Sequence, residues 1–214
     1  MFARPDTGAA PISYPVPTWS ACKAMCESVA RGFFRDGGSP EAFFSPTQVE
    51  LLKPIRFEKY VTNYRGPLRK TAQIKKGASY QLPATILVDV CYRIEAECVQ
   101  IGGKSENKIN AAHGLQEMFN RRLGRGKSKY APCLGWKEFL PTYFGLPRDH
   151  EPRHVERKLQ EDINMTIPAL LLSVWDAPAR GAYGPIFCER LIKAGVLKFP
   201  AVRVADGKLS FERD

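Results

Sequence analysis

The residues best suited to chemistry in this chain are five cations within nine consecutive positions near its middle: Arg121, Arg122, Arg125, Lys127 and Lys129. Gly124 and Gly126 interrupt the run, Tyr130 follows it directly, and no acidic residue stands between Asn120 and Trp136. Arginine and lysine neutralise phosphate groups, and glycine lets a backbone approach a ligand closely. The pattern predicts a phosphate-binding loop; a solvated basic surface loop is the alternative that this pattern leaves open.

A second basic stretch, Lys53 to Lys76, contains a single acid, Glu58, and two tyrosines, Tyr60 and Tyr64. Basic residues mixed with aromatic ones suit single-stranded nucleic acid, because the rings stack on bases while the cations follow the phosphates. Many solvated loops have the same composition, so this stretch alone is a weak signal. The cations that we assign to a second binding surface are Arg56, Lys59, Arg69 and Lys70.

The overall charge indicates the same class of partner. The chain has 214 residues, a net charge of +10 and a pI near 9.4, and its 44% hydrophobic content suffices for a packed core. We expect an anionic partner, and nucleic acid is favoured over a membrane surface because no basic amphipathic helix with a broad apolar face is evident. The sequence has no apolar run of membrane-spanning length and no recognisable signal peptide, so we expect a cytoplasmic protein.

Metal sites and nucleotide cofactors are not expected. The six cysteines form no CxxC pair and fall mostly on apolar faces, which favours buried, reduced thiols. His150 and His154 have a ligand-like spacing, but Pro152 lies between them and no third ligand is close in sequence. The GGKS run at 102–105 resembles the end of a P-loop, but Cys98 stands where that motif needs its first glycine, so a plain turn is favoured.

Two helices should position the basic run. The later helix should begin near Asn110 and end at Gly124, because its apolar residues have helical spacing and glycine ends helices readily. Those apolar residues are Leu115, Met118, Phe119 and Leu123. The earlier helix should begin after an N-cap at Thr18 and run to about Phe34.

The remaining elements read as strands. Strict alternation of apolar and polar residues predicts one half-buried strand over 85–99. A strand over 49–64 contains Pro54, which confines it to a sheet edge or a bulge. We further expect a loop over 39–47, a charged surface excursion over 148–162 and a buried strand over 166–176. A hairpin should turn near Ala194-Gly195, with a short helix as the alternative, and a second hairpin should turn at Asp206-Gly207.

The order of helix, strand, strand, helix and strand, followed by hairpins, predicts an α+β fold. This order of elements matches a ferredoxin-like (RNA-recognition-type) domain that lacks its first strand and carries a C-terminal β-hairpin extension. We expect residues 1–165 to form the RNA-binding ferredoxin-like domain, and residues 166–214 to supply the final core strand and the β extension.

Several segments, in this order, resemble a known family: SYPVPTWSACKAMCESV, LLKPIRF, LVDVCYRIEAE and RRLGRGKSKYAPCLGWKEF, with the closing KAGVLKFP. Over nearly its whole length the chain is similar to CRISPR-associated protein family five, in its type I-C form. The LGWKEF block after an Arg-Gly loop is the most specific part of this resemblance.

The resemblance implies a ferredoxin-like fold and a role in a Cascade-type surveillance complex. The subunit would bind the 5′ handle of CRISPR RNA (crRNA) at one end of a hetero-oligomer that also contains backbone and large subunits. Type I-C systems lack the usual dedicated processing enzyme, so the resemblance also implies cleavage of precursor crRNA, without metal or other cofactor.

The beginning of the chain departs from the family pattern. The family starts with a strand that leads into a Phe-Arg-Pro segment, whereas this chain begins almost at that segment, Phe2 to Pro5. We expect the first strand to come from another chain or from an earlier start codon, because an open sheet edge is otherwise left.

The catalytic residues depart as well. Metal-free RNA cleavage needs a base for the 2′-hydroxyl proton, an acid for the leaving 5′-oxygen and a cation at the phosphate. The resemblance implies a tyrosine at the end of the first helix and a Lys-His pair before the second; here these positions hold Ala30 and, at or beside the pair, His113-Gly114. His113 is therefore the catalytic candidate, with Lys104 or Lys108 as the cation, and a helix-start residue without a catalytic role is the alternative.

The residues, together with this resemblance, leave three functions open. The leading one is a crRNA-binding subunit that also cleaves precursor crRNA; the others are a non-catalytic scaffold that caps crRNA and a general single-stranded RNA-binding domain. The side chains expected to contact RNA are Arg121, Arg122, Arg125, Lys127, Lys129, Tyr130 and Lys137, with Arg56, Lys59, Arg69 and Lys70 on the second surface.

Overall fold

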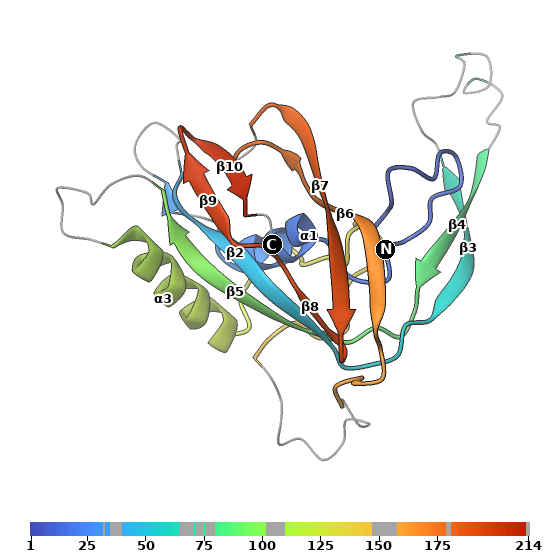
Figure 1. The fold of residues 1–214 in the computed structure, drawn as a ribbon, viewed down its shortest axis with the longest axis horizontal. Coiled ribbons are helices and arrows are strands. Elements are labelled where there is room, and N and C mark those ends of the chain that lie inside the picture. Colours follow the sequence, from blue (N-terminus) through green and yellow to red (C-terminus); the bar gives the residue numbers. More distant parts are fainter. Residues whose placement is uncertain are drawn as a thin grey trace.

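The chain folds as an α+β protein in which a curved antiparallel sheet is packed against two helices (Figure 1). The structure is a computed structural model, and it describes residues 1–31, 33–34, 40–64, 71, 75, 80–101, 110–146, 158–178 and 181–212. The helices are α1 (Trp19–Val29) and α3 (Ala111–Gly124). The strands are β1 (Phe33–Phe34), β2 (Pro40–Leu51), β3 (Phe57–Tyr64), β4 (Tyr80–Leu87), β5 (Tyr92–Gln100), β6 (Met165–Trp175), β7 (Tyr183–Lys193), β8 (Val196–Lys198), β9 (Val202–Ala205) and β10 (Lys208–Phe211).

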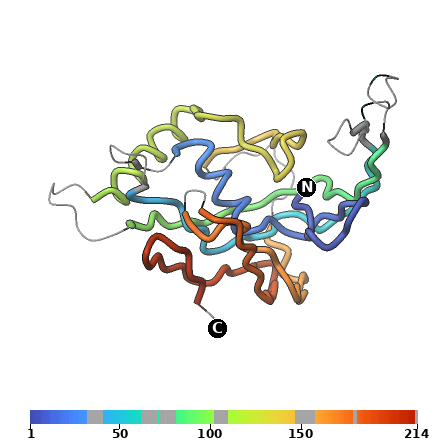
Figure 2. The backbone as a smooth tube through the Cα atoms, turned by 90° about the horizontal axis from the view of Figure 1, so that it is seen from above, coloured from blue at the N-terminus to red at the C-terminus, as the bar shows by residue number. Residues whose placement is uncertain are grey.

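The main sheet is organised around β2. Along one edge β2 pairs with β5 over Ala42–Leu51. Its other edge pairs with the two-residue strand β1 and, over Gln48–Glu50, with β8, which leads through β7 to β6. Strands β3 and β4 form a separate hairpin, and so do β9 and β10. Figure 2 shows α3 on one side of β2 and β5 and the C-terminal hairpin on the opposite side.

Both faces of β2 are therefore buried, and its two adjacent phenylalanines show this. Phe44 faces α3, where its ring centroid lies 5.0 Å from that of Phe119. Phe43 belongs to the main core, which also contains apolar residues of β9 and β10. This burial corrects the loop expected over 39–47: two large apolar side chains on opposite faces stabilise a strand there.

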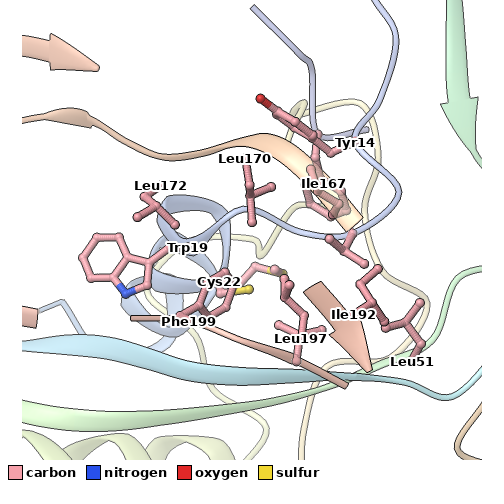
Figure 3. Packing of buried hydrophobic residues seen from close by; sticks show 14 of the residues in the cluster. Tyr14, Trp19, Cys22, Leu51, Ile167, Leu170, Leu172, Ile192, Leu197 and Phe199 are labelled. Carbon is pink, nitrogen blue, oxygen red and sulfur yellow. The ribbon is translucent and has the colours of Figure 1, made fainter. Parts of the chain in front are cut away.

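Helix α1 fills the space between β2 and β6. Its N-cap is Thr18, whose Oγ1 accepts a hydrogen bond from the Ala21 N–H at 3.2 Å, as predicted. The buried face of α1 carries Trp19 and Cys22, which pack among side chains of β6, β8 and the segment after β8 (Figure 3). Those neighbours are Leu170, Leu172, Leu197 and Phe199.

Helix α1 is shorter than predicted. It ends at Val29, because Ala30 has extended backbone angles, and Phe33–Phe34 pair with β2 instead of continuing the helix. Aromatic residues fit a pleated surface well, so pairing with β2 prevails over the helical spacing of this segment.

Two predicted strands are each divided in the structure. The strand expected over 49–64 is the end of β2 and the whole of β3, and Pro54 lies in the break between them. The strand expected over 85–99 is the end of β4 and most of β5, separated at Asp89, which has a φ of 51°. Apolar residues alternate through the second break, from Ile86 to Cys98, and hide it, whereas Pro54 marks the first break.

Other predictions are confirmed. Strand β6 lies within one residue of the strand expected over 166–176, although only part of it is buried, and the hairpins turn at the predicted dipeptides. Positive φ values at Ala194, Gly195, Asp206 and Gly207 are those that two-residue hairpin turns require. The Gly102-Gly103 turn and most of the charged excursion over 148–162 lie outside the described residues.

Tyr14 completes the edge of β6 that does not pair with β7. Its hydroxyl donates to the Ala169 carbonyl at 2.7 Å and accepts from the Leu171 N–H at 3.2 Å. One side chain thus takes the place of two backbone partners on that edge. Burial raises the pKa of the Tyr14 hydroxyl, which keeps the donor proton in place at neutral pH.

We predict that Tyr14→Phe lowers the free energy of unfolding by about 1–3 kcal/mol, because it leaves backbone groups of β6 without partners. Chemical denaturation measures the change. Tyr183→Phe is the matched control, because Tyr183 lies on β7 with 75% of its surface exposed and should lose little. Equal losses in the two variants would contradict the bridging role of Tyr14.

Candidate nucleic-acid interface

Residues 121–130, which we call the basic loop, begin in the last turn of α3, and hydrogen bonds fix their backbone. Helix α3 begins after Asn110, whose side chain accepts hydrogen bonds from the N–H groups of the first turn, and it ends at Gly124, as predicted. The Gly126 N–H then donates to the Leu123 carbonyl at 3.0 Å, and the Lys127 N–H donates to the Arg122 carbonyl at 2.9 Å. Gly126 has a φ of 61°, so a glycine suits this turn.

The loop is then held against the end of α1. The Ser28 carbonyl accepts from the N–H groups of Lys129 and Tyr130, at 2.8 and 2.9 Å. The guanidinium of Arg122 donates to the Val29 carbonyl at 2.9 Å. The last carbonyls of a helix have no partner within the helix, and the last turn of α1 contains no basic residue. The loop therefore satisfies these acceptors and places a cation at the negative end of the helix dipole.

The cations of the loop face solvent. Arg121, Arg125, Lys127 and Lys129 are exposed, and in the described part of the chain none of them is paired with a carboxylate. Tyr130 has 56% of its surface exposed, and the Lys129 ammonium lies 5.6 Å from its ring centroid. Exposed cations beside an exposed ring on a fixed backbone can bind phosphates and stack on a base.

A pocket of about 520 Å³ lies between the end of α1 and the segment that follows the basic loop; we call it the α1–loop pocket. Its polar lining comes from Glu27, Ser28, Arg31, Tyr130 and Lys137, and Leu140 is among its apolar lining residues. Sequence reasoning assigned Tyr130 and Lys137 to RNA but missed Glu27 and Arg31. The helical spacing of Ala24 and Glu27 on α1 was the available signal, but Arg31 lies beyond the helix and the partner segment lies about a hundred residues later in the chain.

The predicted catalytic residues are only partly placed by the structure. His113 lies in the first turn of α3 with its side chain 66% exposed, and its Nε2 is 3.2 Å from Oε1 of Glu117. Ala30 is fully buried beside Phe44 and Leu115, so it offers no functional group to a substrate. Lys104 and Lys108 lie outside the described residues.

One helix carries both His113 and the start of the basic run. The eight residue steps from His113 to Arg121 correspond to a rise of about 12 Å along α3. Both side chains are on the exposed side of this helix. An extended nucleic-acid strand that runs along α3 could therefore contact both side chains.

The second basic surface lies elsewhere. Arg56 and Lys59 are exposed on and just before β3, whereas Arg69 and Lys70 lie outside the described residues. The β3–β4 hairpin and α3 lie at opposite ends of the molecule (Figure 1). The structure therefore does not bring the two predicted sets of cations together.

The LGWKEF block connects the two regions by packing. Phe139 contacts the ring of Tyr60 on β3, with centroids 5.6 Å apart, and stacks on Trp136. Glu138 accepts a hydrogen bond from the Tyr60 hydroxyl at 3.3 Å. Most of this block is thus structural, and Lys137 is the member that lines the α1–loop pocket.

Two of the thiols packed between the helices and the sheet, Cys26 and Cys98, are poor nucleophiles. Burial raises the pKa of Cys26 to about 12 and that of Cys98 to about 11.

No cluster of three or more potential metal ligands occurs among the residues that the structure describes. In the same residues, no helix is long and apolar enough to cross a bilayer.

We predict that Arg122→Ala lowers the free energy of unfolding by about 1.5–3 kcal/mol, because it removes a charged donor from the Val29 carbonyl. Arg121→Ala removes the same charge from an exposed neighbour and should change stability by less than about 0.5 kcal/mol. Urea denaturation of both variants measures the difference. Similar values would show that Arg122 does not hold the loop on α1.

The whole chain was compared with known proteins. No family model matches it. The "CRISPR pre-crRNA endoribonuclease Cas5d" of Mannheimia succiniciproducens is 27% identical, with 93% of this chain and 89% of the relative covered. The protein of the same name from Thermus thermophilus is 26% identical, with 94% and 86% covered.

Solved structures share the fold. A crystal structure of a CRISPR-associated protein superposes with a TM-score of 0.58 at 18% identity and covers 89% of this chain and 83% of the other. The uncharacterised protein SMU1763c from Streptococcus mutans also has a TM-score of 0.58, at 14% identity, with 94% and 87% covered. The chain is thus similar over nearly its whole length to two proteins named Cas5d, at 27% and 26% identity, and it shares the fold of these solved structures.

Proposed function

We propose that this protein binds the 5′ handle of crRNA as a subunit of a type I-C Cascade complex and that it cleaves precursor crRNA. The observation that carries the proposal is the basic loop, whose backbone is fixed on α1 and whose cations face solvent without carboxylate partners in the described part of the chain. The names of the two sequence relatives, both pre-crRNA endoribonucleases, support the assignment of substrate.

We assign the phosphate contacts to Arg121, Arg125, Lys127 and Lys129. Arg122 acts mainly by positioning them, because its guanidinium is engaged with Val29. Arg56 and Lys59, with Arg69 and Lys70, would bind a more distant part of the RNA or a neighbouring subunit. A complex of this kind contains backbone and large subunits, so the protein is expected to act within a hetero-oligomer.

The proposed fold type is ferredoxin-like with its first strand position unfilled. The order of α1, β2, β5, α3 and β6 along the chain supports it, as does the antiparallel pairing of β2 with β5. The hairpin β9–β10 would be the C-terminal β extension.

The proposed cleavage needs no metal. The 2′-oxygen attacks the adjacent phosphorus, the bond to the 5′-oxygen breaks, and the products are a 2′,3′-cyclic phosphate and a 5′-hydroxyl end. The His113 imidazole accepts the 2′-hydroxyl proton, and a protonated group donates to the leaving oxygen. Lys104 or Lys108 is the proposed cation at the phosphate. Ala30 contributes no hydroxyl to this chemistry.

A non-catalytic scaffold that caps crRNA is the second candidate. Two observations favour it: Ala30 is buried, and the His113 ring lies against Glu117 instead of a second catalytic group among the described residues. A general single-stranded RNA-binding domain is a third candidate, and it differs from the others in having no preference for the repeat sequence.

Incubation of the protein with precursor repeat RNA in EDTA tests cleavage. We predict a product that ends in a 2′,3′-cyclic phosphate, and a rate at least about 100-fold lower for His113→Ala, because a general base contributes about 10²–10⁴-fold. Gln116→Ala, an exposed change on the same helix, is the control. RNA that stays intact but tightly bound would establish the scaffold instead.

The phosphate contacts are tested by the salt dependence of binding. Arg121→Ala should weaken binding of the repeat RNA and reduce the slope of log K against log salt by about 0.7, the value for one contact to a single strand. Lys193→Ala, an exposed cation on β7, should leave the slope unchanged. Equal affinity for unrelated strands at matched salt would favour the general RNA-binding domain.

A further inference from the structure

The α1–loop pocket is large enough to hold a nucleobase. Its volume of about 520 Å³ falls within the range of about 300–1,000 Å³ of small-molecule pockets. It adjoins the cations of the basic loop, because Tyr130 belongs to both. An RNA strand bound by those cations would therefore pass the mouth of the pocket.

Tyr130 offers the pocket an aromatic surface. The Tyr130 N–H is bonded to the Ser28 carbonyl at 2.9 Å, so the ring has a fixed attachment, yet 56% of the residue is exposed. Leu140, which also lines the pocket, is 59% exposed. Large apolar side chains exposed at a pocket can be covered by the face of a base.

Glu27 gives the pocket a fixed hydrogen-bond acceptor. Its Oε1 accepts a hydrogen bond from the Lys23 ammonium at 2.5 Å, and the side chains are 28% and 11% exposed. An ionised carboxylate only accepts hydrogen bonds. Guanine presents two adjacent donors, N1–H and the 2-amino group, to such a carboxylate, whereas the single N–H of uracil lies between two carbonyl oxygens that a carboxylate repels.

We propose that the α1–loop pocket binds one unstacked guanine of the RNA, with Tyr130 as its stacking surface and Glu27 as the acceptor that selects it. Lys137, exposed at the same pocket, lies near the backbone of that nucleotide. This inference rests on the proposed function and adds a base preference to it.

The test uses oligo(U) strands of about ten nucleotides, a length within single-strand site sizes, into which one guanosine is placed at each position in turn. In fluorescence anisotropy, the best-placed guanosine should tighten binding about tenfold or more. Inosine at that position lacks the 2-amino group and should lose most of the gain. The inosine comparison uses the unaltered protein, so it does not depend on whether a variant folds.

Variants complete the test. Glu27→Gln should abolish the preference for guanosine over uridine, whereas Glu189→Gln, an exposed carboxylate on β7, should keep it. Tyr130→Ala should weaken every strand about tenfold and Tyr130→Phe should not, because only the ring is needed. RNA binding without guanosine preference, or a preference that survives in Glu27→Gln, would overturn the inference alone. Absence of binding to the repeat RNA itself, measured in the same assay, would instead overturn the proposed function.

Discussion

The site depends on how the carbonyl groups at the end of α1 are satisfied. The Ser28 and Val29 carbonyls accept three hydrogen bonds from residues about a hundred positions later in the chain. A buried acceptor without a partner costs free energy, so these bonds fix the backbone of the basic loop while its side chains remain in solvent. On the proposed roles, the backbone that carries the cations therefore requires little ordering when RNA binds, which favours affinity.

This arrangement is stable only because α1 is itself immobile. Trp19 and Cys22 lie in the main core between β2 and β6, and Cys26 and Ala30 lie in the second core beside α3. Since both helices contact β2, the sheet determines where the end of α1 meets the end of α3. The strands therefore act on the site through the helices and not by direct contact with it.

Local features of the structure could be predicted from the sequence and long-range ones could not. Thr18 at the start of α1, Gly124 at the end of α3 and the Asp206-Gly207 turn all obey rules that involve a few neighbouring residues. Alternation over 85–99 concealed the break at Asp89, because apolar spacing carries no information on φ. Arg122 was assigned to RNA together with Arg121, since nothing in the sequence distinguishes an arginine that faces the Val29 carbonyl from one that faces solvent.

The length of helix α3 also fixes a distance within the proposed site. On the proposed roles, it carries the reactive imidazole near one end and the phosphate-gripping cations at the other, about 12 Å apart. Because an α-helix has a fixed rise per residue, this spacing would fix the distance between the nucleotides bound by the cations and the bond that is cut. One inserted residue within it would turn the two ends by about 100° relative to each other, so the helix length, and not only its side chains, defines where the RNA would be cut.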